Sequence, residues 1–183
     1  MPIPVDENIE NLEIYNSRNR YKDLFFALSH GVNFGDLKRR KTDEREIVIN
    51  NLMKKFPKIN YNFLGIANEK PKWNYDFFDE LLKTKMALNL SRGKPLKYTS
   101  SNRIAALIGN GIYTFIDKKT NFKDFFNENE VGSYKDLDDL GSKIEKLKSK
   151  PNLINKYGKA GRDKYFKLFN TKKISKEIID IIF

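Results

Sequence analysis

Residues 98–117 read YTSSNRIAALIGNGIYTFID, and this stretch decides the fold. Ser100 and Ser101 precede an apolar series at helical spacing, and adjacent serines in that position are typical of a helix N-cap. The glycines that close the series are expected to end the helix. Residues 111–117 then form a short apolar run of the kind that is buried in a sheet. A helix that leads through glycine into a buried strand predicts a parallel α/β sheet.

Short apolar runs alternate with amphipathic runs along the rest of the chain, which is the pattern of repeated βαβ units. Asn74 is expected to cap one of the helices. Strands are expected at 23–29, 60–66, 86–91, 111–117 and, at a sheet edge, 130–134. Besides the helix after Ser101, helices are expected at 42–56, 75–84, 120–126, 137–149, 152–169 and 171–183. The sequence therefore predicts the α/β class: a single Rossmann-like, doubly wound domain with a mainly parallel sheet.

The composition excludes several kinds of site. The chain has no cysteine, which excludes a disulfide framework, a cysteine-bound zinc or cluster, and a cysteine nucleophile. His30 is the single histidine, and neither an EF-hand loop nor another clustered acidic spacing is present, so no metal is expected.

The start of the chain has neither a basic region nor an apolar stretch of signal-peptide length, and no later run approaches the length of a membrane span. We therefore expect a cytoplasmic protein, with peripheral contact to the inner face of a membrane left open. Residues 1–20 lack the strand-like opening of a complete domain. They are interpreted as a linker or the remnant of a preceding domain, and residues 21–183 as the domain itself.

The formal net charge of +11 has two interpretations. Clustered Lys and Arg neutralise phosphates, which would indicate nucleic acid, an anionic membrane surface or a polyanionic ligand. The basic residues here are scattered lysines interleaved with Glu and Asp, in a background rich in Asn, Ile, Phe and Tyr. An A/T-biased genome encodes this composition by default, and nucleic acid is therefore not expected as the partner.

In an open parallel sheet, ligands bind beyond the carboxyl ends of the strands. The first loop there is 29–35, SHGVNFG, in which Ser29 and His30 can donate hydrogen bonds and Gly31 allows close backbone approach. It lacks the GxGxxG dinucleotide fingerprint. His30 has the chemistry of a general base, although a phosphate or sugar contact suits its position better; a plain βα turn is the alternative.

The second loop, 90–103, combines basic side chains and hydroxyls with the start of a helix. A helix N-terminus carries partial positive charge and unpaired N–H donors, so it suits a phosphate or diphosphate. The alternative is an exposed loop that is basic because the protein is basic. Trp73 also has two interpretations: its ring stacks on a nucleotide base, or it packs against the edge of the sheet. The residues expected to hold a diphosphate are Ser100, Ser101, Asn102, Arg103, Arg92 and Lys94.

Two segments carry a resemblance to a known family. Residues 100–117, SSNRIAALIGNGIYTFID, resemble the serine-led helix and following strand of group 1 glycosyltransferases. Residues 126–170 resemble the tail of that family, which ends in a G-x-x-G-R helix (Gly158, Gly161, Arg162). From about Asp23 to the end, the chain thus resembles the carboxy-terminal, donor-binding half of a GT-B fold glycosyltransferase.

The resemblance implies transfer of a sugar from a nucleotide-diphosphate donor, with no cofactor besides this donor substrate. The diphosphate would lie between the loop after the first strand and the helix that follows Ser101. Arg92 and Lys94 would neutralise the leaving nucleotide without a metal. The acceptor, a saccharide or a lipid-linked molecule, would require an N-terminal acceptor domain.

The sequence departs from the family at one pair of positions. Group 1 enzymes commonly carry two glutamates eight positions apart, of which the second contacts the donor ribose; the corresponding residues here are Tyr98 and Ala106. Residues 86–104 also partly match the donor motif of fucosyltransferases. The resemblance therefore leaves the base and the donor sugar open.

Three functions stay open. The first is a donor domain that is active only with an acceptor domain. The second is a noncatalytic basic α/β module that binds nucleic acid or anionic membrane. The third is a degenerate half without ligand, which Ala106 favours. Donor binding requires positive groups that converge on one crevice, whereas a polyanion binder requires a stripe of them and loses affinity steeply in salt.

Overall fold

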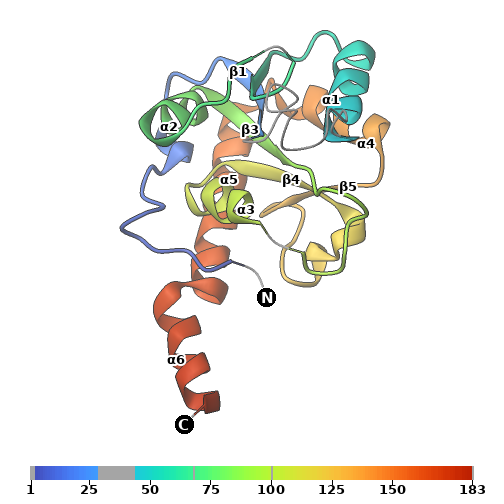
Figure 1. Cartoon of the computed structure of the whole chain (residues 1–183). Helices are drawn as coiled ribbons and strands as arrows, with labels where there is room; N and C mark the ends of the chain where they lie inside the picture. Colours follow the sequence, from blue (N-terminus) through green and yellow to red (C-terminus); the bar gives the residue numbers. More distant parts are fainter. Residues whose placement is uncertain (1–2, 29–43, 68, 100, 183) are drawn as a thin grey trace.

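The strands form one sheet in which every neighbouring pair is parallel, in the order β2-β1-β3-β4-β5 (Figure 1). The computed structural model describes residues 3–28, 44–67, 69–99 and 101–182. The strands are β1 (Lys22–Ala27), β2 (Tyr61–Leu64), β3 (Thr84–Asn89), β4 (Tyr113–Asp117) and β5 (Gly132–Tyr134). The order reverses between β1 and β3, so the chain winds outward from the centre in both directions. The predicted Rossmann-like, doubly wound α/β domain is confirmed.

The described residues also form six α-helices and three 3-10 turns. The helices are α1 (Glu44–Lys55), α2 (Asn74–Leu82), α3 (Asn102–Gly109), α4 (Leu137–Leu147), α5 (Pro151–Phe169) and α6 (Thr171–Ile182); the turns are η1 (Ile14–Asn16), η3 (Lys118–Thr120) and η4 (Phe122–Asp124). The helix predicted at 120–126 is wrong, because Asn121 has a left-handed backbone (φ 57°) that separates two short turns. The predicted Asn74 cap is also wrong: Asn74 is the first residue of α2, and no side chain caps that helix.

Alternate side chains of β1 face two different helical layers. Leu24 and Phe26 pack against α1 and α4, which lie together in Figure 1. Phe25 packs on the opposite face, against α2, α3 and η1. In the paired strands, Phe25 lies opposite Ala87 of β3, and Ala87 lies opposite Thr114 of β4. The buried core therefore fixes the register that brings the ends of β1 and β3 together.

Helix α5 requires glycine where it crosses the segments that lead into β4 and β5. A Cβ on Gly158 would overlap the carbonyl of Gly111, and one on Gly161 would overlap the carbonyl of Glu130. The next residue, Arg162, lies over the Phe166 ring (4.5 Å to the centroid) and donates from Nη2 to the carbonyl of Glu10 at 3.2 Å. The G-x-x-G-R motif therefore packs α5 against the domain.

The N-terminal residues 3–20 run along α3 and α5. Val5 exchanges backbone hydrogen bonds with Phe169 and Thr171 at 3.0 and 2.9 Å. Ile14 is fully buried, and the N–H of Leu12 donates to Oδ1 of Asn110 at 3.1 Å. This segment is packed on the domain, while its interpretation as a linker or remnant stays a prediction.

Helix α6 extends away from the body of the domain (Figure 1). Ile174 is its one buried residue. Four further isoleucines of α6 are 46–84% exposed: Ile178, Ile179, Ile181 and Ile182. Within the described residues, no helix combines the length and the hydropathy that a membrane crossing needs.

Candidate functional site

A cavity of about 440 Å³ opens where β1 and β2 end, beside the start of α3. This is the carboxyl edge of the sheet at the point where the strand order reverses, the usual ligand site of open α/β sheets. Its volume lies in the range of small-molecule sites. The lining residues come from β1 and the residue after it, from β2, from the start of α2 and from the start of α3: Ala27, Leu28, Leu64, Lys72, Trp73, Phe77, Ser101, Asn102, Arg103 and Ala106.

The polar end of the cavity is the N-terminus of α3. Ser101 occupies the N-cap position with an extended backbone (φ −129°, ψ 159°), as the sequence predicts, but its side chain does not cap the helix. The Oγ of Ser101 instead donates to Oδ1 of Asn89 at 3.3 Å. Without a side-chain cap, the positive end of the helix dipole faces the cavity.

Arg103 lies on the same wall and makes three contacts with other described residues. Its guanidinium lies 4.9 Å from the centroid of the Phe26 ring, and Nη1 donates to the carbonyl of Leu90 at 3.2 Å and to Oδ1 of Asn89 at 3.4 Å. Asn89 is 3% exposed and thus positions both Ser101 and Arg103. Sequence reasoning missed Asn89, and the one signal for it is a polar residue inside the apolar run 86–90.

The opposite wall is aromatic. Trp73 is 54% exposed beside the cavity, and Phe77 packs edge-on against Phe25 with 5.4 Å between ring centroids. Lys72 adds a second cation, whose Nζ contacts Oε1 of Glu80 at 2.9 Å. Burial raises the pKa of Glu80, but hydrogen bonds from Lys83 and Lys72 outweigh it and leave that pKa below its ordinary value.

The floor of the cavity depends on a glycine in the loop after β2. Gly65 has a left-handed backbone (φ 70°), and a Cβ on it would overlap the carbonyl of Leu28. Only glycine lets the two loops approach so closely. The ends of β1 and β2 therefore meet at the base of the cavity.

The structure brings together three of the predicted site residues: Ser101, Asn102 and Arg103 all line the cavity. Arg92 and Lys94 are exposed on the loop between β3 and α3 and are not part of its wall. Their proposed contact with a diphosphate stays a prediction. Four predicted residues lie outside the described residues: Ser29, His30, Gly31 and Ser100.

The two positions that differ from the family have separate surroundings. Ala106 lines the cavity with a methyl group. Tyr98 instead bonds away from it, from its hydroxyl to Oδ2 of Asp124 and from its N–H to the carbonyl of Thr120, both at 2.8 Å. Over the described ranges, no group of three His, Cys, Asp or Glu side chains could hold a metal ion.

The family described as "Glycosyl transferase-like" matches residues 39–180 of this 183-residue chain. The chain belongs to this family. The match includes every part of the cavity except the end of β1. No curated protein matches the sequence of this glycosyltransferase domain.

Solved structures share the fold of the glycosyltransferase domain at low sequence identity. TarM is 14% identical with a TM-score of 0.60, over 91% of this chain and 36% of its own. Sucrose-phosphate synthase from Thermosynechococcus elongatus is 17% identical with a TM-score of 0.56, over 98% of this chain and 44% of its own. The C-terminal domain of the group 1 glycosyl transferase LpcC from Francisella tularensis is 10% identical with a TM-score of 0.50, over 92% of this chain and 96% of its own.

The family and the shared fold together confirm the predicted recognition. The glycosyltransferase domain has the Rossmann-like architecture of one half of a GT-B fold of the group 1 type. It spans less than half the length of TarM and of sucrose-phosphate synthase.

Proposed function

We propose that this domain binds a nucleotide-diphosphate sugar in the cavity beside α3 and presents it for glycosyl transfer. One observation carries the proposal: Arg103 lies at the start of α3, which has no side-chain cap, Lys72 lies on the opposite wall, and none of the described lining residues is acidic. A site with converging positive charge and no carboxylate suits a diphosphate.

The diphosphate would bind at the start of α3, where the guanidinium of Arg103 supplies donors; the hydroxyl of Ser101 would add one only by exchanging its bond to Asn89. Charge-assisted hydrogen bonds of this kind contribute about 1.5–3 kcal/mol each. Trp73 would stack on the base, as its exposed ring at the aromatic wall allows. Ala106 offers no hydrogen bond to a ribose, so base and phosphate contacts would provide the affinity.

In the transfer step, an acceptor oxygen forms a bond to the anomeric carbon while the bond from that carbon to the diphosphate oxygen breaks. Negative charge grows on the leaving diphosphate, where Arg103, the α3 dipole and the predicted Arg92 and Lys94 would stabilise it electrostatically. The proton of the acceptor hydroxyl passes to a base, for which His30 is a candidate from the sequence. The product is the glycosylated acceptor and a nucleoside diphosphate.

The acceptor and its binding domain are also part of the proposal. Because two fold relatives are more than twice as long as the region they share with this chain, we place a saccharide or lipid-linked acceptor on a further, N-terminal domain. The reaction would take place in the cytoplasm.

The single tryptophan of the chain, Trp73, lies in the cavity wall and provides the assay. Titration with UDP, GDP, their sugar conjugates and CMP-sugars should change its fluorescence saturably at moderate salt. A short DNA duplex and anionic vesicles, tested alongside, address the alternative that the charge of +11 favours, a basic binding module. A fluorescence response to either polyanion that disappears at higher salt, without any response to a nucleotide, would refute the proposal. No fluorescence response to any of the ligands would indicate a degenerate half.

A further inference from the structure

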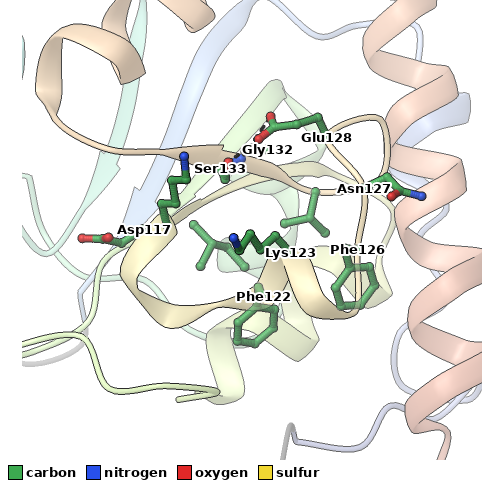
Figure 2. Close-up of a pocket in the computed structure, with 11 residues that line it drawn as sticks. Asp117, Phe122, Lys123, Phe126, Asn127, Glu128, Gly132 and Ser133 are labelled. Carbon is green, nitrogen blue, oxygen red and sulfur yellow. Dashed lines mark hydrogen bonds between the residues drawn. The ribbon is translucent and has the colours of Figure 1, made fainter.

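A second cavity, of about 330 Å³, lies between the end of β4, the two 3-10 turns that follow it, and β5. It shares no lining residue with the cavity beside α3. Its floor is apolar and buried: Ile116, Phe122, Phe126 and Val131. Phe122 and Phe126 stack with 6.2 Å between ring centroids, and Figure 2 shows both below the charged side chains in that view.

The rim of this cavity carries equal numbers of both charges. Asp117 and Glu128 supply two carboxylates, and Lys118 and Lys123 supply two ammonium groups (Figure 2). The formal charge of the lining is therefore zero. The cavity beside α3, by contrast, is lined by two cations and no described acid. The two cavities thus differ in the charge of the ligand that each would accept.

Both carboxylates of the rim are held in place by the backbone. Oδ1 of Asp117 accepts from the N–H of Lys119 at 2.8 Å. Oε2 of Glu128 accepts from the N–H of Ser133 at 3.3 Å, and its other oxygen accepts from the Ser133 hydroxyl. Each carboxylate keeps further lone pairs for a ligand, since an ionised carboxyl group has about four acceptor positions. The acceptors are therefore fixed, while the exposed lysines supply donors.

An aromatic floor below fixed acceptors and donors suits a neutral, polyhydroxylated ring. The C–H faces of a sugar ring pack on apolar and aromatic side chains, and its hydroxyls both donate and accept hydrogen bonds. We infer that this second cavity binds a neutral saccharide unit, at a site separate from the cavity beside α3. The choice of a saccharide over another neutral polyol rests on the proposed function, because a glycosyltransferase acts among saccharide chains.

Amide chemical-shift mapping of the whole chain by NMR tests the inference. The probes are the methyl glycosides of glucose, galactose and N-acetylglucosamine, with inorganic phosphate and UDP for comparison. At least one glycoside should shift the amides of Asn127, Gly132 and Ser133 saturably, while phosphate and UDP leave them unchanged. An absence of saturable shifts with all three glycosides would overturn the inference, as would equal shifts with phosphate.

Matched variants locate the binding. Lys123→Gln removes a rim ammonium group and Glu128→Gln removes a rim charge, and each should weaken the glycoside by about tenfold. Lys119→Gln and Asp124→Asn change exposed neighbours that do not line the cavity and should leave the affinity unchanged. Since Lys123 is exposed, its variant keeps the inference testable even if Glu128→Gln disturbs β5.

The same samples separate this inference from the proposed function. Trp73 fluorescence reports nucleotide binding at one cavity, and the amides of β5 report the other. Nucleotide binding without any glycoside shift would refute the saccharide site alone. Glycoside shifts without a nucleotide response would refute the donor site and leave the second cavity as a saccharide site.

Discussion

Replacing Arg103 with glutamine separates the two roles that the structure supports for this side chain. With other described residues, Arg103 makes two hydrogen bonds of 3.2 and 3.4 Å and one cation–π contact at 4.9 Å. The two bonds are long, so about 0.5 kcal/mol for each, with about 0.5–1 kcal/mol for the cation–π contact, is an appropriate estimate. Loss of these contacts in Arg103→Gln should therefore lower the free energy of unfolding by about 1.5–2 kcal/mol.

The expected loss of ligand affinity is larger. If the guanidinium holds a diphosphate, its removal costs about 1.5–3 kcal/mol of binding, or about ten- to a hundredfold in Kd. The stability change corresponds to a decrease of about 3–8 °C in Tm for a chain of this length. Trp73 fluorescence measures the first quantity, and thermal unfolding followed by circular dichroism measures the second.

Two control variants make the result specific. Arg18→Gln removes the same group from an exposed position that does not line the cavity and should leave both the Kd and the Tm unchanged. Arg103→Lys keeps the positive charge but not the planar fork, so it should recover part of the affinity. A lower Tm for Arg103→Gln with an unchanged Kd would refute the binding role and leave Arg103 as a structural residue.

Three further predictions concern stability. Leu140→Ala should destabilise the domain by about 2–5 kcal/mol in urea unfolding, because Leu140 is fully buried between α4 and the sheet. Gly158→Ala should destabilise it by about 1–3 kcal/mol or more in the same assay, because the added methyl overlaps the carbonyl of Gly111. The pKa of Glu80 lies below its ordinary value of 4.5. The stability from its contacts with Lys72 and Lys83 is therefore present above pH 4.5 and is lost as the pH falls through the folded-state pKa. The Tm difference between wild type and Glu80→Gln should shrink over that acid range.

Each of these has an outcome that would contradict it. A near-neutral Leu140→Ala would mean that α4 does not bury this face, and Ile178→Ala on the exposed side of α6 provides the matched control with little expected effect. Unchanged stability of Gly158→Ala would show that α5 can move away from Gly111. A Tm difference for Glu80→Gln that stays constant in acid would show that its carboxylate gains nothing from the two lysines.

Local sequence patterns predicted the parts of the fold that depend on the residues within one element. Apolar runs between turn residues located all five strands, since a strand buried on both faces needs a continuous run. Apolar spacing wrongly predicted a helix at 120–126, because it does not reveal the left-handed backbone of Asn121 that separates two short turns there. Asn74 failed as a cap for a similar reason: it adopts a positive φ of 52° inside the first turn of α2.

The candidate site was predictable only where its residues are contiguous in sequence. Ser101, Asn102 and Arg103 follow one strand and begin one helix, so local reasoning placed them on a common wall. Lys72 and Phe77 reach the cavity because α2 packs beside α3, a tertiary contact that no local pattern encodes.

The single buried residue of α6 has a consequence for hydrogen exchange. Beyond Ile174, the helix has no buried contact that must break before its amides meet water. A helix of 12 residues is marginally stable in water by itself, so its backbone bonds open by local fraying. The amides after Lys176 should therefore exchange within the fastest class of the chain, whereas those of α5 around Tyr165, which is fully buried, should exchange only when the whole domain unfolds. The cooperative unit thus ends just after the first turn of α6, which contains Ile174.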